Sequence, residues 1–346
     1  MTSIRVAVTG MGAVCAAGYG VEALLACLRD GRSRVTRLAD AVPQGPCLSA
    51  QIEGEALEAA ADLTGISEAL VRATRRSVGR APRALQWSTF AALEAYHAAG
   101  LHTTDHDGTD TALIVGGHNL SNQYTAELYA KFKDTGYLVP SYGLNFLDTH
   151  HVGTISELLG IRGEGFTVGG ASGSGGVALV DGFRLIRHGY AKRCLVVGAP
   201  ALLGPMERFA FFQMGAMGGK RFADRPEAAC RPFDADREGF IPGEGAACLV
   251  LEAEDAAQAR GLAPRLFLDG AARKLDGNRL TDPGLAGEIA VMRAVLDQAG
   301  ALPDAVTYIN AHGTASVLGD EVEAAAIRTV FGQGPLVNST KALIGH

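Results

Sequence analysis

Short apolar runs rich in β-branched residues recur along the chain, separated by longer alanine-rich stretches. A short run bounded by glycine or polar residues is typical of a strand, whereas apolar residues spaced three and four positions apart favour a helix. The pattern predicts strands at residues 4–9, 111–115, 165–168, 194–197, 246–251, 306–310 and 336–338. It predicts helices at residues 21–28, 83–99, 154–159, 175–188, 287–298 and 320–330. This alternation indicates an α/β fold built in layers.

Two long segments interrupt the alternation. Residues 31–80 and 201–243 are rich in glycine, proline and charge and carry a less regular pattern. Long segments between the regular elements of an α/β fold often contain binding or catalytic residues. We expect these two to form the walls of an active site and the contacts of a dimer.

The order of the predicted elements suggests an internal duplication. A strand ending in polar or glycine residues, and then a strand followed by a small-residue turn, occur at 113–119 and 166–176 and again at 308–314 and 337–346. The sequence therefore predicts an N-terminal half at residues 1–243 and a C-terminal half at residues 244–346. The second half stops where the first still has a helix and a strand to come, so it is predicted to be incomplete.

The net charge and the distribution of basic residues limit which kinds of partner the protein can bind. The 346 residues carry a net charge of −6 and no concentrated Lys/Arg stripe, which argues against a nucleic acid. An acidic protein partner needs only a local basic patch. Arg72, Arg75 and Arg76 are close enough in sequence to form one, the alternative being a solvated helix face.

The cysteine spacing and the hydropathy of the chain indicate in which cellular compartment the protein is found. Six cysteines are scattered without metal-ligand or CxxC spacing, a pattern typical of reduced thiols in a cytoplasmic protein. No metal or other cofactor is predicted. No apolar segment is long enough to span a bilayer.

Ser172 stands in a turn of small residues, GFTVGGASGSGG, at residues 165–176. A strand enters this turn and a helix leaves it. The turn can therefore hold the Ser172 side chain beside a helix N-terminus, where backbone N–H groups and the helix dipole favour negative charge. The alternative is a glycine-rich packing turn that binds nothing.

Two histidines occupy similar positions in the second half. His312 lies in the segment NAHGT and His346 ends the segment NSTKALIGH, in which Lys341 precedes it by five residues. Each follows a predicted strand, so both rings can point into a cleft. Two such donors can converge on one carbonyl oxygen and stabilise an enolate or oxyanion. A lone histidine is more often structural.

Together with the charged turn RPFDADREGFIPGEG at residues 231–245, these segments resemble the β-ketoacyl-acyl-carrier-protein synthase (ketosynthase) family. The opening VTGMGAV at residues 8–14 matches as well, and the resemblance covers essentially the whole chain. It implies a thiolase-like fold of two similar halves in a layered αβαβα arrangement. It also implies a homodimer acting on acyl groups carried as thioesters on the phosphopantetheine of an acyl carrier protein.

The resemblance assigns roles to individual residues. A cysteine at the position of Ser172 takes up the acyl chain in that family, and histidines at the positions of His312 and His346 activate the malonyl thioester. A lysine at the position of Lys341 supports the site. The nearby Thr314, Asp320 and Glu323 are expected to have supporting roles.

Serine at position 172 changes the expected reaction. A serine hydroxyl is far less acidic than a cysteine thiol and needs an aligned base before it can attack. Loss of CO2 from a malonyl group needs no nucleophile. Residues 148–157 and 167–175 resemble the serine-bearing malonyl-carrier-protein decarboxylases of polyketide β-branching cassettes, which supply acetyl-carrier protein to a partner similar to hydroxymethylglutaryl synthase. The sequence therefore predicts decarboxylation of malonyl-carrier protein to acetyl-carrier protein.

Other functions stay open. Ser172 is compatible with condensation, and an inactive ketosynthase partner subunit is a further alternative, against which His312, His346 and Lys341 argue. A Ser-His-acid hydrolase is disfavoured because the serine turn lacks the usual glycine spacing. A dinucleotide site at residues 8–15 is disfavoured because Cys15 occupies the third glycine position.

The resemblance also predicts a segment that this sequence lacks. Family members continue past the position of His346 with a glycine-rich helix, further strands and a loop that supplies a backbone donor to the oxyanion site. We expect the chain to be a fragment of a longer protein.

Overall fold

A computed structural model describes residues 4–39, 47–63, 65–104, 107–277 and 282–346. Its strands are β1 (Val6–Cys15), β2 (Gly18–Tyr19), β3 (Thr36–Arg37), β4 (Leu48–Ser49), β5 (Thr111–Gly116), β6 (Gly165–Val168), β7 (Arg193–Gly198), β8 (Gly245–Ala253), β9 (Phe267–Leu268), β10 (Tyr308–Asn310) and β11 (Leu336–Asn338). Its α-helices are α1 (Val21–Asp30), α2 (Ala56–Ala61), α3 (Glu68–Val78), α4 (Arg83–Ala98), α5 (Asn122–Thr135), α6 (Tyr142–Asn145), α7 (His150–Leu159), α8 (Ser174–Arg187), α9 (Pro205–Gln213), α10 (Glu254–Ala259), α11 (Leu285–Ala299), α12 (Val317–Phe331) and α13 (Lys341–Ile344). Single 3₁₀ turns lie at Leu101–Thr103, Ala171–Gly173, Pro226–Ala228 and Pro303–Ala305.

A mixed sheet of seven strands forms the centre of the molecule. Its main path runs β2-β1-β8-β7-β5-β6, and β9 pairs with β1. The strands β7, β5 and β6 are parallel, whereas β8 is antiparallel to both β1 and β7. The predicted α/β class is confirmed. β8, which begins at Gly245, belongs to this sheet, and the division of the chain at residue 243 stays a prediction.

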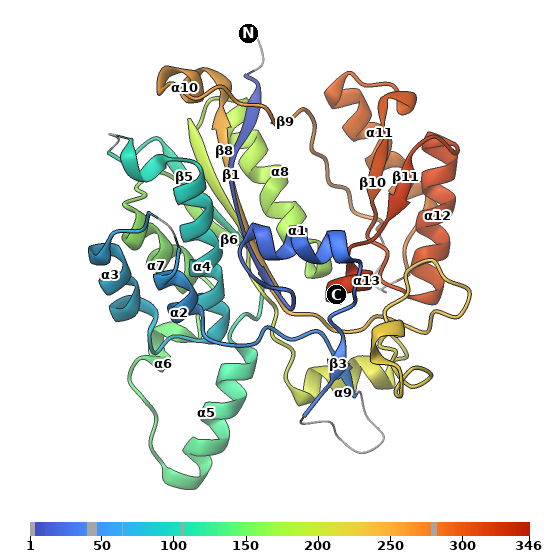
Figure 1. Ribbon diagram of the computed structural model, residues 1–346, viewed down its shortest axis with the longest axis horizontal. Coiled ribbons are helices and arrows are strands. Elements are labelled where there is room, and N and C mark those ends of the chain that lie inside the picture. Colours follow the sequence, from blue (N-terminus) through green and yellow to red (C-terminus); the bar gives the residue numbers. More distant parts are fainter. Residues whose placement is uncertain (1–3, 40–46, 64, 105–106, 278–281) are drawn as a thin grey trace.

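Helices cover both faces of the sheet, because alternate residues of its strands point to opposite sides. Val115 of β5 packs in one buried cluster with Trp87 of α4. Its neighbour Ile114 packs in another cluster with Phe183 of α8. Figure 1 shows α4 and α7 on one side of the sheet and α8 on the other. Since β5 is buried along its whole length, it reads as a continuous apolar run rather than an alternating one.

The first strand is longer than the predicted 4–9, since it continues through Gly10 and Gly12 to Cys15. These glycines let α4 approach the strand closely. A Cβ on Gly12 would lie 2.0 Å from the carbonyl oxygen of Ala91, and one on Gly10 would lie 2.2 Å from that of Ala95. The glycine pattern that resembles a dinucleotide fingerprint therefore serves helix packing.

A second, smaller sheet lies in the C-terminal part of the chain. Its strands β10 and β11 are parallel and register Asn310 against Asn338. Figure 1 shows them beside α11 and α12, on the side of the central sheet that α8 covers. The parallel register brings the loops after both strands, which carry His312 and His346, to the same edge.

The two segments with a weak pattern contain short helices. The structure places α2 and α3 in residues 31–80 and α9 in residues 201–243. Arg72, Arg75 and Arg76 are exposed on α3. Within the described residues, no helix combines the length and the apolar character needed to cross a bilayer.

A buried ion network joins the far ends of β7 and β8 to α10. The Glu252 carboxylate, fully buried, accepts hydrogen bonds from Nε of Arg193 at 2.8 Å and from Nη2 of Arg260 at 2.8 Å. Arg193 also donates through Nη1 to Asp110 at 2.9 Å. Buried charges are tolerated only when paired in this way.

We expect Glu252→Ala to destabilise the protein by about 3–5 kcal/mol, because it leaves two guanidinium groups near the core without their carboxylate. Glu254, which pairs with Arg5 at the surface, is the matched control. Its replacement by alanine should cost less than about 1 kcal/mol. Urea unfolding of both variants measures the difference, and equal losses would contradict this account of the network.

Candidate active site

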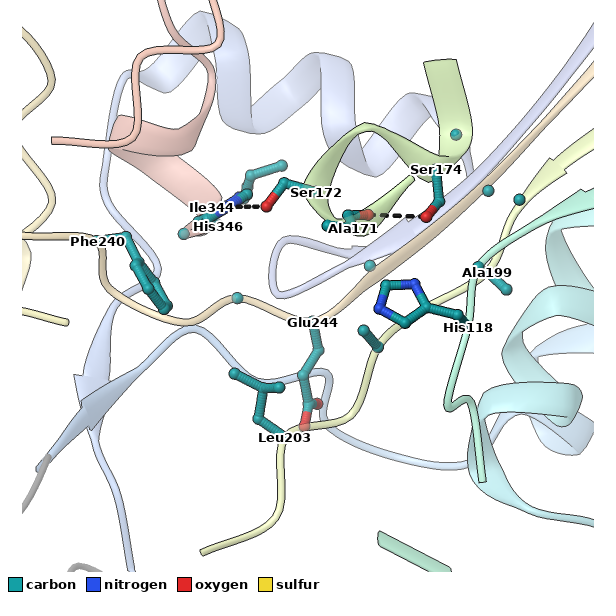
Figure 2. Close-up of a pocket in the computed structure, with 18 of the residues that line it drawn as sticks. His118, Ala171, Ser172, Ser174, Ala199, Leu203, Phe240, Glu244, Ile344 and His346 are labelled. Atoms are coloured by element: carbon teal, nitrogen blue, oxygen red, sulfur yellow. Dashed lines mark hydrogen bonds between the residues drawn. The ribbon is translucent and has the colours of Figure 1, made fainter. Parts of the chain in front are cut away.

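An open pocket of about 420 Å³ lies where the parallel strands β5 and β7 end. Its wall is formed by residues 116–118 after β5, by the turn before α8, by residues 198–199 after β7, by residues 243–245 before β8, and by residues 344–346. The carboxyl ends of parallel strands are the usual place for a site in an α/β sheet. Figure 2 shows Ser172 and His346 together on one wall of this pocket.

The turn that carries Ser172 is fixed by local hydrogen bonds. Ser174 Oγ accepts a hydrogen bond from the Gly170 N–H at 2.9 Å and donates one to the Ala171 carbonyl at 2.8 Å. Ala171 has a φ of +47°, a conformation that non-glycine residues rarely adopt. Strain of this kind persists only where the surroundings enforce it. The turn therefore presents Ser172, which is exposed, just ahead of the first turn of α8.

His346 and His312 meet beside this serine. Nε2 of His346 lies 3.2 Å from Oγ of Ser172, within hydrogen-bond distance. The His312 and His346 rings are perpendicular, with centroids 5.4 Å apart. Phe240 packs edge-on against the other side of His346, at 5.3 Å between centroids. His346 is thus held between an aromatic ring and a second imidazole.

Two carboxylates of α12 hold the loop that carries His312. Glu323 accepts hydrogen bonds from the backbone N–H groups of His312 at 2.7 Å and Gly313 at 2.8 Å. Asp320, which is 2% exposed, accepts from the N–H groups of Thr314 and Ala315 at 3.0 and 3.1 Å. Both predicted supporting carboxylates therefore act on the backbone of the loop.

The remaining predicted residues also lie close to these loops. Lys341 Nζ donates to the carbonyl of His312 at 2.7 Å, so it links the two histidine loops. The Thr314 hydroxyl donates to Ser316 Oγ at 3.1 Å, within the same loop. Neither side chain is part of the pocket wall.

The environment keeps both imidazoles neutral. Desolvation, together with the charge of Lys341, lowers the pKa of His346 to about 3 and that of His312 to about 4. Desolvation also lowers the pKa of Lys341. A neutral imidazole donates one N–H and is a weak base here, so the pair is suited to stabilising negative charge on an oxygen.

No cysteine lines the pocket. Cys15, Cys27, Cys194, Cys230 and Cys248 are buried and Cys47 is half-buried. Burial raises the pKa of the Cys230 thiol, the one nearest Lys341, to about 12, and this thiol donates to the Lys341 carbonyl at 2.9 Å. None of these thiols is placed for attack on a thioester in this pocket.

The sequence left open whether His118, His150 and His151 approach the pocket, and it missed two side chains of the pocket wall, Phe240 and Glu244. His118 follows β5 by two residues, while Phe240 and Glu244 precede β8. Glu244 is half-buried and accepts a hydrogen bond from the Ile52 N–H at 2.8 Å, and desolvation raises its pKa. The position of His118 after a buried parallel strand is a signal that sequence analysis can use. His150 and His151 lie on α7 and do not line the pocket.

Neither the pocket nor the rest of the described chain gathers three side chains that suit a metal ion. His346, the Ser172 hydroxyl and the N-terminus of α8 line a single cavity, and the His312 imidazole packs against His346 without lining the cavity itself. Chemically, this arrangement can polarise a carbonyl group and hold the resulting enolate.

Relatives of known activity match the chain along its length. It is 42% identical over 254 residues to the polyketide biosynthesis malonyl-ACP decarboxylase PksF of Bacillus subtilis (strain 168), a match that covers 73% of this chain and 61% of that protein. It is 29% identical over 355 residues to the 3-oxoacyl-[acyl-carrier-protein] synthase 2 of Staphylococcus aureus (strain MRSA252), covering 99% of this chain and 82% of the synthase.

Solved structures agree with these relatives. A β-ketoacyl synthase from Burkholderia phymatum STM815 superposes with a TM-score of 0.83 at 25% identity, covering 99% of this chain and 82% of its own. The ishigamide ketosynthase/chain length factor superposes with a TM-score of 0.85 at 26% identity, covering 100% of this chain and 82% of its own. The thiolase-like fold predicted from the sequence is confirmed.

The model of the β-ketoacyl synthase N-terminal domain matches residues 3–257, and that of the C-terminal domain matches residues 267–346. Since the two together account for nearly the whole sequence, the chain belongs to the β-ketoacyl synthase family.

Proposed function

We propose that this chain decarboxylates malonyl-acyl-carrier protein to acetyl-acyl-carrier protein in polyketide β-branching. The observation that carries the proposal is a pocket lined by no thiol, in which the His346 imidazole lies beside Ser172 and packs against a second imidazole, that of His312. His312 itself is not part of the pocket wall. The 42% identity to a malonyl-ACP decarboxylase supports it.

The reaction uses the two histidines at the carbonyl oxygen of the malonyl thioester. The bond between the malonyl Cα and its carboxylate breaks and CO2 leaves, while the bonding electrons move into the thioester to form an enolate. His346 and His312 each donate an N–H to the enolate oxygen, which lowers the barrier because the charge develops there only in the transition state. Protonation of Cα then gives the acetyl thioester, which stays on the carrier.

Ser172 is poorly placed to act as a nucleophile in this site. Its hydroxyl is much less acidic than a thiol, and its neighbour at 3.2 Å is His346. A histidine whose pKa is lowered to about 3 is a weak base and does not readily take a proton from a hydroxyl group. In our proposal, Ser172 donates a hydrogen bond to the substrate and keeps the pocket small and polar. Serine thus replaces the nucleophilic cysteine of condensing relatives.

The same proposal names the partners. The substrate arrives on the phosphopantetheine arm of an acyl carrier protein, and the acetyl product passes to an enzyme similar to hydroxymethylglutaryl synthase. The chain acts as a cytoplasmic homodimer with no cofactor of its own. Strand β6 supports the dimer, because it lies at the edge of the central sheet and its first residue, Gly165, is exposed. An edge strand is available to pair with another chain.

The direct test is to incubate the purified protein with malonyl-carrier protein and to follow the carrier by intact mass spectrometry. We expect conversion to acetyl-carrier protein. His312→Ala should slow it by about 10²–10³-fold because one enolate donor is lost. Ser172→Ala should keep most of the rate because no bond to Oγ forms. His188→Ala, on the surface after α8, is the control and should match the unmodified protein.

Two outcomes would contradict the proposal. A malonyl carrier that stays unchanged would favour the partner-subunit alternative, in which the chain has no reaction of its own. Transfer of an acyl group onto Ser172 would favour a condensing synthase.

The lowered histidine pKa values give a pH test. Both imidazoles are the active donors when neutral, and their protonation begins only as the pH falls toward about 4. We therefore expect kcat not to fall between about pH 7.5 and pH 5.5. Lys341→Met removes a positive charge that lowers both pKa values, so it should move the acid-side loss of activity toward neutral pH. Profiles of kcat against pH for both proteins measure this, and a loss centred near pH 6.5 without the mutation would refute it.

A further inference from the structure

His118 lies on the wall of the pocket away from the pair Ser172 and His346. Figure 2 shows its ring directed into the cavity, with Glu244 and Ala199 nearby. His118 is exposed to this space. In the part of the chain that the structure describes, its ring forms no hydrogen bond and no ion pair. An imidazole with an unoccupied donor and acceptor therefore faces the place where a substrate binds.

The backbone around His118 is held firmly. The Gly117 N–H donates to the carbonyl of Val168 at 2.9 Å, which ties the loop to the neighbouring strand. The N–H groups of Asn119 and Leu120 donate to the two oxygens of Asp148 at 2.8 and 2.9 Å. The loop is thus fixed on both sides of the histidine.

Two further features, the backbone conformation of Asn119 and the glycine at position 169, affect the space around the His118 ring. Asn119 has a φ of +54°, a left-handed conformation that asparagine tolerates better than most residues. Residue 169 is a glycine, and a Cβ there would lie 3.5 Å from Cβ of His118 and 3.9 Å from its Nδ1. A Cβ at 169 would therefore be in ordinary van der Waals contact with the His118 side chain. A loop held in a strained conformation next to a pocket side chain indicates a positioned functional group.

The reaction proposed above leaves one step without a residue. His346 and His312 serve the oxygen of the enolate, but its Cα must gain a proton after CO2 has left. Their lowered pKa values mean that neither carries a spare proton at neutral pH. For His118 to reach it, the Cα must lie on the side of the pocket away from His346.

We propose that His118 delivers this proton. This inference rests on the proposed decarboxylation. When the Cα–carboxylate bond breaks, its electrons form the enolate. These electrons then take the extra proton of His118 in its imidazolium form as the Cα–H bond forms and the carbonyl is restored, which leaves His118 as a neutral imidazole. His118 regains its proton from solvent, to which it is open. The sum is one malonyl thioester and one proton giving one acetyl thioester and CO2.

A role in holding the malonyl carboxylate is a weaker explanation. A positive charge on the carboxylate would stabilise the ground state, because the negative charge moves away from that group as the bond breaks. Binding the ground state more tightly than the transition state slows the reaction. A proton donor that faces Cα is favoured instead, because negative charge moves toward that carbon and its enolate as the bond breaks.

The test compares His118→Ala with the unmodified protein, His188→Ala and His312→Ala in the same malonyl-carrier assay. We expect His118→Ala to lower kcat by about a hundredfold while KM stays within about twofold. Added free imidazole should restore a large part of that loss, because a small acid can enter the space left by the ring. It should not restore His312→Ala, whose loss concerns the enolate oxygen. His118→Gln, which keeps the volume without a transferable proton, should behave like His118→Ala.

Each other result rejects the role of His118. An unchanged kcat means that water supplies the proton. A raised KM with unchanged kcat means that His118 only binds substrate, and a loss that imidazole does not restore, with a lowered melting temperature, means that it only supports the loop. If the unmodified protein leaves malonyl-carrier protein intact, the decarboxylase proposal fails and this inference fails with it. The unmodified protein is the control that separates this failure from a failure of the role of His118 alone.

Discussion

The position of His312 depends on two carboxylates that never touch the pocket. Glu323 and Asp320 on α12 accept backbone N–H groups from four consecutive residues, His312 to Ala315. Lys341 then attaches the carbonyl of His312 to the loop that ends in His346. Hydrogen bonds between charged side chains and backbone are stronger than neutral ones and fix direction as well as distance. Without this clamp, nothing would hold the two rings perpendicular beside Ser172.

The same constraint connects the small sheet to the large one. The pair β10 and β11 brings the two histidine loops to one edge, and the His346 backbone then joins the wall of the pocket, donating to Ile241 at 2.8 Å and accepting from Gly243 at 2.7 Å. Gly243 and Gly345 make this contact possible, because a Cβ on Gly243 would lie 2.2 Å from the Ile344 carbonyl. His346, near the end of the described chain, is thereby placed against Ser172, which lies 174 residues earlier in the sequence.

Local patterns predicted the parts of the fold in which apolar burial dominates. β6 and β11 were predicted at the residues they occupy, and α4 within one residue, because turn residues bound them clearly. β1 was cut short because Gly10 and Gly12 look like a turn until α4 is seen against them. α5 was missed although Tyr124, Leu128 and Phe132 stand four residues apart, and none of its residues is buried. Glu244 was missed and His118 was left open, because only the strand arrangement brings them to the pocket. Motif matching identified the serine and both histidines, whose roles stay proposals.

A pocket without a thiol differs from a cysteine-dependent active site in how it responds to oxidants. An enzyme that depends on a reactive thiolate is exposed to peroxide, which converts that sulfur to sulfenic acid and then to irreversible oxidised forms. Here the pocket wall offers a hydroxyl group, which does not enter that series, and five of the six cysteines are buried away from it. The site is therefore built from groups that oxidative stress and thiol-directed alkylating agents leave unmodified.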